Sequence, residues 1–427
     1  MNPKKLFNLA KEIFPIYRSI TGEGVRKTLH ILKKKNPLIK IKSIPSGKKI
    51  FDWTIPREWK INEAYIVTPD GKKICDIKKN NLHLVSYSES VNKYLTYGEL
   101  IKRLHSLKKM PEAIPYVTSY YKDYWGFCIS ENEKKKLSKK GLYKAFIDSE
   151  KFKGVLNYGE AFIKGKSKKE IFISTYICHP SLANNEVSGP TVSSFILNFI
   201  RKKKRYFSYR FVFVPETVGS IAYLSRNHVK LKKNIFAGFN LTCIGDERSY
   251  SYLQSRNGNT ISDKVAKITL NSIDPKYKKY SWYHRGSDER QYCSPGIDLP
   301  IASIMRTKYG EYKEYHTSLD NLGNVVTGKG LFGGYKAVKE ILDILENNKI
   351  PLANFKCEPF MSKRKLYPTT SFARNSNYNK SYMDILTYAD GKKSLIDIAY
   401  ECKKDFYYIL TLAKKLEKNN LIRLKNL

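Results

Sequence analysis

Apolar runs alternate with amphipathic stretches through the middle of the chain, from about Leu142 to Ile350. Short uninterrupted apolar runs are typical of buried strands, and apolar positions three or four residues apart are typical of helices. Regular alternation of the two predicts an α/β sheet covered by helices. Strands are expected at Lys144–Ile147, Ile171–Tyr176, Phe211–Val214 and Ile301–Met305, and helices at Thr191–Lys202, Ser220–Arg226, Ile261–Leu270 and Gly334–Glu346.

The segments on either side of this region have different patterns. Residues 1–36 predict two amphipathic helices joined by a turn at Thr21–Gly24. From about Pro45 to Ser130, short alternating runs are separated by turn signals such as Pro69-Asp70-Gly71. This pattern indicates a compact, mostly β segment, with one helix at Tyr97–Leu107.

The C-terminal region predicts a winged-helix-like module. It follows a loop rich in Lys, Pro, Ser and Asn at Ser362–Lys380. Ser394 is a plausible N-cap for the middle one of three short helices. The helices are expected at Tyr382–Ala389, Ser394–Glu401 and Phe406–Asn419, with a final strand at Leu421–Leu424.

Length and composition allow two or three packed domains. The chain has 427 residues, of which 41% are hydrophobic. No run is apolar for the roughly 18 residues of a membrane helix, and the N-terminus lacks the apolar core of a signal peptide. The seven cysteines are scattered and include no CxxC pair, so no disulfide framework or zinc knuckle is indicated. We therefore expect a cytoplasmic protein without a membrane partner.

The formal net charge of +39 raises the question of an anionic partner such as a nucleic acid. The basic residues are mostly lysines spread along the whole chain, and Asn, Ile and Tyr are abundant as well. That combination favours a general compositional bias. Binding of nucleic acid or protein through the C-terminal module stays open as an alternative.

Histidine and acidic residues follow the predicted strands in a set order. His179 comes directly after the apolar run that starts at Ile171, and Glu216 follows the run Arg210–Val214. Neutral imidazole and carboxylate are common zinc ligands, and α/β folds bind ligands at the carboxyl ends of their strands. Three more polar segments follow in the order acid, Asp-containing loop, His: Gly238–Glu247, His284–Pro300 and Glu314–Asp320. The ordered set predicts a metal site.

This set resembles the zinc-dependent aminopeptidases of the leucyl aminopeptidase and glutamate carboxypeptidase type. His179 matches the first histidine ligand of that family, and Tyr315-His316-Thr317 matches the last. Asn185 lies at the position of the bridging Asp, and Glu216 at the position of the Glu pair. The resemblance implies a zinc-exopeptidase-like three-layer α/β fold and hydrolysis of an amide bond by metal-activated water. It also implies one zinc or two, and a small peptide or aminoacylated substrate.

The resemblance assigns roles to individual residues. The expected metal ligands are His179, Asn185, Glu216, Asp246 and His316; the expected catalytic residues are Glu216 and Glu186; the expected substrate-binding residues are Arg285, Asp288, Arg290, Tyr292 and Arg306.

An aminopeptidase-like group of unknown function resembles the chain more fully. Its hallmarks here include Cys178–Ala183, Arg285–Tyr292 and Glu314–Asp320. Its members are often associated with surface-polysaccharide gene clusters. The resemblance implies three domains: a discontinuous catalytic domain (1–45 and 131–355), a small, mostly β inserted domain (46–130) and a C-terminal winged-helix domain (362–427).

Three positions depart from the zinc aminopeptidase pattern. Asn185, Thr217 and Thr242 are neutral where the family has carboxylates. An amide brings no charge with which to bridge two zinc ions, so we expect one zinc. The departures also favour an alternative: a metallopeptidase-derived protein that binds or modifies a sugar-linked or aminoacylated metabolite. A homo-oligomer stays open.

Overall fold

The computed structural model describes residues 2–366 and 376–427. The chain divides into two compact units. The first comprises Met1–Arg256 with Lys278–Lys336, and the second Asn257–Tyr277 with Ala337–Leu427. None of the helices among the described residues combines the length and the apolar run that crossing a membrane would require.

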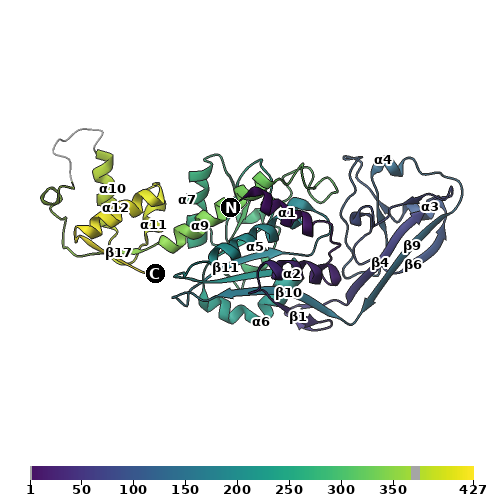
Figure 1. Cartoon of the computed structure of the whole chain (residues 1–427), viewed down its shortest axis with the longest axis horizontal. Helices are drawn as coiled ribbons and strands as arrows, with labels where there is room; N and C mark the ends of the chain where they lie inside the picture. The colour runs from purple at the N-terminus through teal and green to yellow at the C-terminus, as the bar shows by residue number, and fades with distance from the viewer. Residues whose placement is uncertain (1, 367–375) are drawn as a thin grey trace. The chain divides into compact units, whose positions relative to one another are not determined.

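An eight-stranded sheet forms the centre of the first unit (Figure 1). Its strands are ordered β1-β10-β12-β11-β13-β16-β14-β15, and β12, β11, β13 and β16 are parallel to one another. The inner strands are buried along nearly their whole length, as the apolar runs predicted. The bounds are β1 Lys40–Pro45, β10 Val155–Ile163, β11 Glu170–Tyr176, β12 Ser208–Val214, β13 Ile235–Leu241, β14 Ser251–Leu253, β15 Lys278–Tyr280 and β16 Ile301–Met305.

Helices cover both faces of this sheet. Successive residues of a strand point to opposite faces. Phe172 of β11 contacts Tyr223 of α6 (Val218–Asn234) and Tyr292 of α8 (Glu289–Tyr292). Thr175, three residues further along β11, lies against Gly189 of α5 (Ser188–Ile200) on the other face. The predicted three-layer α/β fold is confirmed. The predicted N-terminal helices are α1 (Pro3–Ile13) and α2 (Glu23–Lys35).

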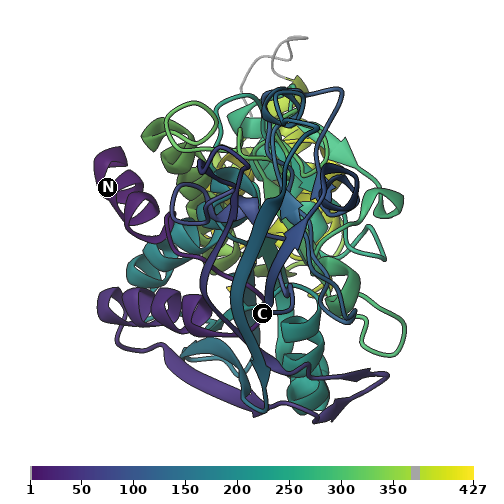
Figure 2. The same cartoon turned by 90° about the vertical axis from the view of Figure 1, so that its right-hand side faces the viewer.

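A second, four-stranded sheet has the order β5-β4-β9-β6, and Figure 2 turns it toward the viewer. Its strands are β4 (Glu58–Val67), β5 (Lys73–Ile74), β6 (Val91–Leu95) and β9 (Tyr143–Phe152). The sequence assigned Lys144–Ile147 to the large α/β sheet, and that assignment was wrong. The segment belongs to β9, because its alternating buried and exposed residues suit a sheet with one covered face, and it pairs with β4 and β6.

The rest of this region consists of short elements. The predicted helix at Tyr97–Leu107 is only α3 (Tyr97–Ile101), because Leu104 already pairs with Phe127. One apolar core runs from the small sheet into the large one and includes both Ile66 and Phe172. The remaining bounds are β2 Lys49–Ile50, β3 Trp53–Thr54, β7 Leu104–His105, β8 Phe127–Cys128 and α4 Glu131–Lys134.

The second unit contains a winged helix. Ser394 caps α11 by a reciprocal pair of hydrogen bonds with Asp397, as its position predicted. The unit contains α7 (Ile261–Ile273) and the end of α9 (Gly328–Asn347). Its other elements are β17 Ile350–Ala353, α10 Ser376–Thr387, α11 Leu395–Glu401, α12 Phe406–Lys418 and β18 Ile422–Lys425, with β17 and β18 antiparallel. Residues 367–375 of the predicted loop Ser362–Lys380 lie outside the described part.

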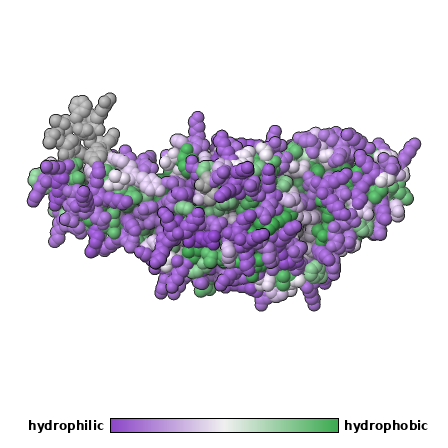
Figure 3. Space-filling view, viewed as in Figure 1, coloured by the Kyte–Doolittle hydropathy of each residue, from purple (hydrophilic) through white to green (hydrophobic). Residues whose placement is uncertain are grey.

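The face of the molecule in Figure 3 is mostly hydrophilic, with apolar residues scattered over it. Basic residues also occur inside the protein. Arg210 of β12 is buried and binds Glu170 of β11 at 2.6 Å and Glu160 of β10 at 2.5 Å. One guanidinium therefore bridges two carboxylates on the neighbouring strands, and Lys42 supplies a second positive charge beside Glu160.

Replacing Arg210 by Ala should destabilise the first unit by about 3–5 kcal/mol, because the buried Glu170 would lose the guanidinium that it binds and Glu160 would be left with Lys42 as its counter-charge. All four tryptophans lie in this unit, so unfolding in urea followed by tryptophan fluorescence reports on it. The exposed Arg201→Ala should change the free energy of unfolding by less than ~0.5 kcal/mol. Equal effects of the two substitutions would contradict this account of Arg210.

Candidate metal centre

Three parallel strands end at one edge of the large sheet. β11 pairs in parallel with β12 on one side and with β13 on the other. His179 follows β11, Glu216 follows β12, and Thr242 follows β13. The fold therefore gathers three of the predicted positions at the carboxyl edge of the sheet, where α/β proteins bind ligands.

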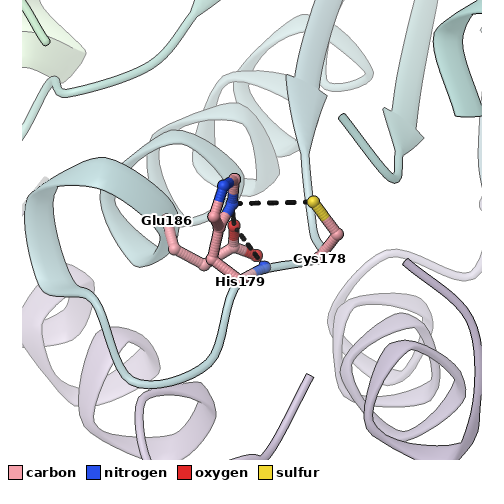
Figure 4. Close-up of side chains that lie close together, drawn as sticks. All are labelled: Cys178, His179 and Glu186. Carbon is pink, nitrogen blue, oxygen red and sulfur yellow. Dashed lines mark hydrogen bonds and ion pairs between the residues drawn. The ribbon is translucent and has the colours of Figure 1, made fainter. Parts of the chain in front are cut away.

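The imidazole of His179 is held from one side by Glu186 (Figure 4). Its Nδ1 lies 2.8 Å from Oε2 of Glu186, and the same oxygen accepts a hydrogen bond from the backbone N–H of His179. A carboxylate at Nδ1 fixes the ring orientation of a metal-binding histidine and leaves Nε2 for the metal. The predicted role of Glu186 as proton acceptor does not fit this position, because its carboxylate is bound at the Nδ1 side of the ring.

Arg18 supplies the counter-charge for Glu186. Its Nε lies 3.3 Å from Oε1 of Glu186 and donates to the backbone carbonyl of His179 at 2.9 Å. Its Nη1 donates to the carbonyl of Ile13 at 2.6 Å. Arg18 is only 1% exposed. Because a buried ion pair is stable only when its geometry is well satisfied, these contacts tie the N-terminal segment to the strand that ends in His179.

Cys178, His179 and Glu186 each offer a ligand atom within 4.8 Å of the others. Burial raises the pKa of the Cys178 thiol to about 11, so it stays protonated. The carboxylate of Glu186 is already neutralised by Arg18. We therefore place no metal inside this group, and Figure 4 shows it as a support for the imidazole.

The open side of His179 faces Glu216. Nε2 of His179 lies 3.4 Å from Oε2 of Glu216. This is close to the distance of roughly 3.3 Å between two ligands of one tetrahedral zinc ion. Burial opposes charge on both groups, but their contact prevails: it lowers the pKa of Glu216, and hydrogen bonds with Glu186 and Glu216 raise the pKa of His179. A metal ion at Nε2 of His179 would replace the proton on that nitrogen, because a proton and a metal ion bind the same lone pair.

Thr217, the residue after Glu216, has a strained backbone. Its φ is 62° and its ψ is −77°, and the N–H of Val218 donates to the carbonyl of Glu216 at 2.7 Å. This is a three-residue γ-turn of the rare, strained kind. Strain of this type persists only where surrounding contacts hold it, and it clusters at functional sites.

His316 comes from a loop and reaches the same place. Its ring centroid is 5.8 Å from that of His179, and the ring of Tyr116 lies against both at 5.3 and 5.2 Å. Tyr315 stacks on His316 at 3.9 Å. Burial lowers the pKa of His316 to about 3, so the imidazole is neutral. Its buried Nε2 has no hydrogen-bond partner among the described residues, which leaves it free to bind a metal.

Residues 114–116 hold the His316 loop in place. The N–H of Tyr116 donates to the carbonyl of His316 at 2.9 Å, and the N–H of Ile114 donates to Oγ of Ser318 at 3.0 Å. Pro115 and Thr317 form an isolated β-bridge. Residues 114–116 therefore border the site on one side. Sequence patterns missed this role, because these residues lie about 200 positions before the loop they contact.

Asn185 and Thr242, where the resemblance implies acids for a second metal ion, share a hydroxyl partner instead. The Tyr176 hydroxyl donates to Oδ1 of Asn185 at 3.1 Å and shares a 2.5 Å hydrogen bond with the Thr242 hydroxyl. The backbone N–H of Asn185 donates to Asp320 at 3.0 Å. Asn185 and Thr242 do lie together, as the resemblance implies, but they present no carboxylate to a cation.

Asp246 does not replace the acid missing at Thr242. Both of its oxygens are used by neighbouring donors, which are Nδ2 of Asn184 at 2.9 Å, the N–H of Arg248, and the N–H and hydroxyl of Thr307. The predicted ligand role of Asp246 does not fit this position, because the carboxylate holds two loops together and none of its contacts is with His179 or His316.

The five predicted substrate-binding residues lie in different surroundings. Asp288 accepts from the N–H of Thr217, Arg290 donates to the Thr217 hydroxyl at 3.1 Å, and the buried Tyr292 bonds Ser174 at 2.7 Å. Arg306 is buried with its guanidinium 3.8 Å from the Tyr250 ring, and Arg285 is exposed beside Trp282. Asp288 and Arg290 thus contact the turn after Glu216. Their predicted role in substrate binding stays a prediction.

The residue types present suit one zinc ion. Two histidines and one carboxylate, His179, His316 and Glu216, are the kind of set that catalytic zinc takes, with a position left for water or substrate. The observation that supports this fit is the buried, partnerless Nε2 of His316 beside the His179–Glu216 pair.

The fold and the site define the aminopeptidase-like class. A zinc aminopeptidase from Bacillus subtilis superposes with a TM-score of 0.59 at 12% identity, over 80% of this chain and 94% of that one, which shows a shared fold. The chain belongs to the family described as Domain of unknown function (DUF4910), whose model matches residues 7–348; a winged helix-turn-helix model matches residues 339–424.

One relative and one solved structure from Clostridium acetobutylicum are similar to this chain along nearly its whole length. One relative is 43% identical over 422 residues, 98% of this chain and 96% of its own, and its name assigns it provisionally to polysaccharide biosynthesis with an aminopeptidase-like domain. A crystal structure of a protein provisionally named as a peptidase is 41% identical, covers 99% of this chain and 96% of its own, and has a TM-score of 0.90.

Replacing Glu186 by Gln should destabilise the first unit by about 3 kcal/mol, because Arg18 would stay buried without its counter-charge. The exposed Glu23 also pairs with an arginine, Arg26, so Glu23→Gln is a matched control that should cost less than ~1 kcal/mol. Urea unfolding followed by tryptophan fluorescence measures both. A loss no larger than that of the control would show that the Arg18–Glu186 pair does not support the site.

Proposed function

We propose that this protein is a single-zinc hydrolase of the aminopeptidase-like class, with His179, Glu216 and His316 as metal ligands. The proposal rests on the arrangement of three side chains. Nε2 of His179 lies 3.4 Å from Oε2 of Glu216, and the ring of His316 lies beside that of His179. The buried Nε2 of His316 has no hydrogen-bond partner among the described residues. Bound zinc would lower the pKa of a coordinated water toward ~7 and polarise a substrate carbonyl.

The chain's own residues prepare this site in three ways. Glu186 fixes the imidazole of His179 through Nδ1, so that Nε2 points to the metal position. Tyr116 packs its ring against both histidines and bonds the Tyr120 hydroxyl at 2.7 Å, which shields the imidazoles from water. Ser287 holds the second oxygen of Glu216 at 2.9 Å, so that a single oxygen of that carboxylate faces the metal position.

The proposed reaction is hydrolysis of an amide bond in a small peptide or aminoacylated compound. The support for this substrate class is the shared fold with zinc aminopeptidases. The site differs from a two-metal centre at Asn185, Thr217 and Thr242, which leaves Glu216 as the carboxylate that faces the histidines. As a ligand Glu216 is not available as the proton acceptor, so we expect slower hydrolysis than a two-zinc site would give.

Purified protein should bind close to one zinc ion per chain, and His316→Ala should weaken zinc binding by more than ~100-fold. That loss exceeds the ~10–100-fold expected when only a group that orients a ligand is changed. Isothermal titration of the metal-depleted protein with Zn²⁺ measures both quantities. The exposed His30→Ala is the matched control and should bind as the wild type does. Absence of zinc binding by the wild-type protein would refute the proposal.

Glu216→Gln should reduce hydrolysis of aminoacyl chromogenic substrates by the zinc-loaded protein by at least ~100-fold, because the neutral amide is a poor zinc ligand in place of a carboxylate. The variant keeps the side-chain shape and the contact with Ser287. Initial rates at several zinc concentrations separate weak metal binding from slow chemistry. Unchanged rates in this variant would exclude Glu216 from the reaction.

A second candidate is a protein that binds or modifies a sugar-linked or aminoacylated metabolite without hydrolysing peptides. It is favoured by the neutral Tyr176–Asn185–Thr242 network, and it agrees with the polysaccharide-biosynthesis name of the Clostridium acetobutylicum relative. If the wild-type protein binds zinc but hydrolyses none of a broad panel of aminoacyl substrates, this candidate replaces the hydrolase.

A further inference from the structure

We propose that Ser287 and Asp288 are positioning residues for Glu216: together they hold its carboxylate and the strained turn after it in the orientation that binds metal. The inference rests on the proposed function, since it concerns the same metal site. It gives the segment Gly286–Arg290 a role in arranging the metal ligand, in addition to the substrate contacts expected from the sequence.

Ser287 acts on the carboxylate itself. Its hydroxyl donates to Oε1 of Glu216 at 2.9 Å, and Ser287 is buried. The other oxygen, Oε2, faces Nε2 of His179. A carboxylate that rotates freely could present either oxygen or both. The Ser287 hydrogen bond occupies one of them and so selects a single oxygen for the metal.

Asp288 acts on the turn that presents Glu216. Its Oδ1 accepts from the N–H of Thr217 at 2.8 Å and from the hydroxyl of Ser220 at 2.8 Å. Arg290 adds a hydrogen bond to the hydroxyl of Thr217. Thr217 has the strained φ of 62°, which needs such contacts to persist. The segment therefore holds Thr217 through both its backbone and its side chain.

The segment has a rigid base of its own. The carboxylate of Glu289 is fully buried, and its Oε1 accepts from the N–H groups of Gly286 and Ser287 and from the Tyr309 hydroxyl. Its Oε2 accepts from Asn240 of β13 and Ser303 of β16. Glu289 thus fixes Ser287 and Asp288 to two strands of the central sheet, so that Glu216 is held from the sheet and not by a loose loop.

Co²⁺ binding to the full-length, metal-depleted protein tests the inference, because its visible absorption spectrum reports both affinity and ligand geometry. Ser287→Ala should weaken Co²⁺ binding by ~10–100-fold and change the spectrum, as expected when a group that orients a ligand is lost. Ser174→Ala is the matched control. It also removes a buried serine hydroxyl, the one that bonds Tyr292, but it does not touch Glu216. It should leave the affinity and the spectrum unchanged.

Asp288 gives a second, independent variant. Asp288→Asn keeps an oxygen that can accept from Thr217 and Ser220, so it should bind Co²⁺ nearly as the wild type does, whereas Asp288→Ala should lose affinity. The free energy of unfolding in the absence of metal is measured alongside for each variant, to separate a loss of folding from a loss of positioning.

The outcomes distinguish the two proposals. If the wild-type protein binds no Co²⁺ or Zn²⁺, the proposed function fails. If the wild type binds metal and Ser287→Ala binds it equally well with the same spectrum, the positioning role is overturned and the metal site stands. A loss of affinity in Ser287→Ala that is matched in Ser174→Ala would also overturn it, since the effect would then be general to the fold.

Discussion

The site depends on a line of buried charges that runs from Arg18 through Glu186 and His179 to Glu216. Each member is held by the next: Arg18 neutralises Glu186, Glu186 fixes the His179 ring, and His179 faces Glu216. Burying charges is costly unless each one has a partner. The chain meets this requirement with residues from its N-terminal segment, from β11 and the loop after it, and from the end of β12.

The same arrangement supports the proposal of a single metal ion. The parallel strands bring His179, Glu216 and Thr242 to one edge, but Thr242 and Asn185 are joined by the Tyr176 hydroxyl. The carboxylate that faces the histidines is that of Glu216, and the 286–290 segment fixes one of its oxygens. The site thus has neutral side chains at Asn185 and Thr242, whereas the carboxylate of Glu216 is held by a hydrogen bond from Ser287.

The sequence predicted the architecture well, because apolar runs and helical periodicity reflect burial directly. It placed β11, β12, α5 and the winged helix. It also singled out His179, Glu216 and His316, which the structure brings close together. It misassigned Lys144–Ile147, because a short apolar run does not show which sheet it will join. It also placed Asp246 among the ligands, because proximity along the chain does not show where a carboxylate points.

Other contributors have no local pattern. Arg18 lies 161 positions from His179, and Tyr116 about 200 from His316, so only the folded chain brings them together. Ser287 and Asp288 were noticed as part of a polar segment, and Asp288 was predicted to bind substrate, but their contacts with Glu216 and Thr217 depend on how α8 packs against α6 and β16. In general, the sequence reveals which chemistry the site contains, and tertiary contacts decide which atoms face it.

X-ray absorption at the zinc edge, on protein loaded with Zn²⁺, tests the central claim most directly. The account predicts about one zinc per chain, bound by two imidazole nitrogens and a carboxylate oxygen at ~2.0–2.2 Å, with no sulfur ligand. A sulfur neighbour at ~2.3 Å would move the metal to Cys178, and a second metal at ~3.5–4 Å would restore a two-zinc centre. Either result, or a protein that retains no zinc, would contradict the account.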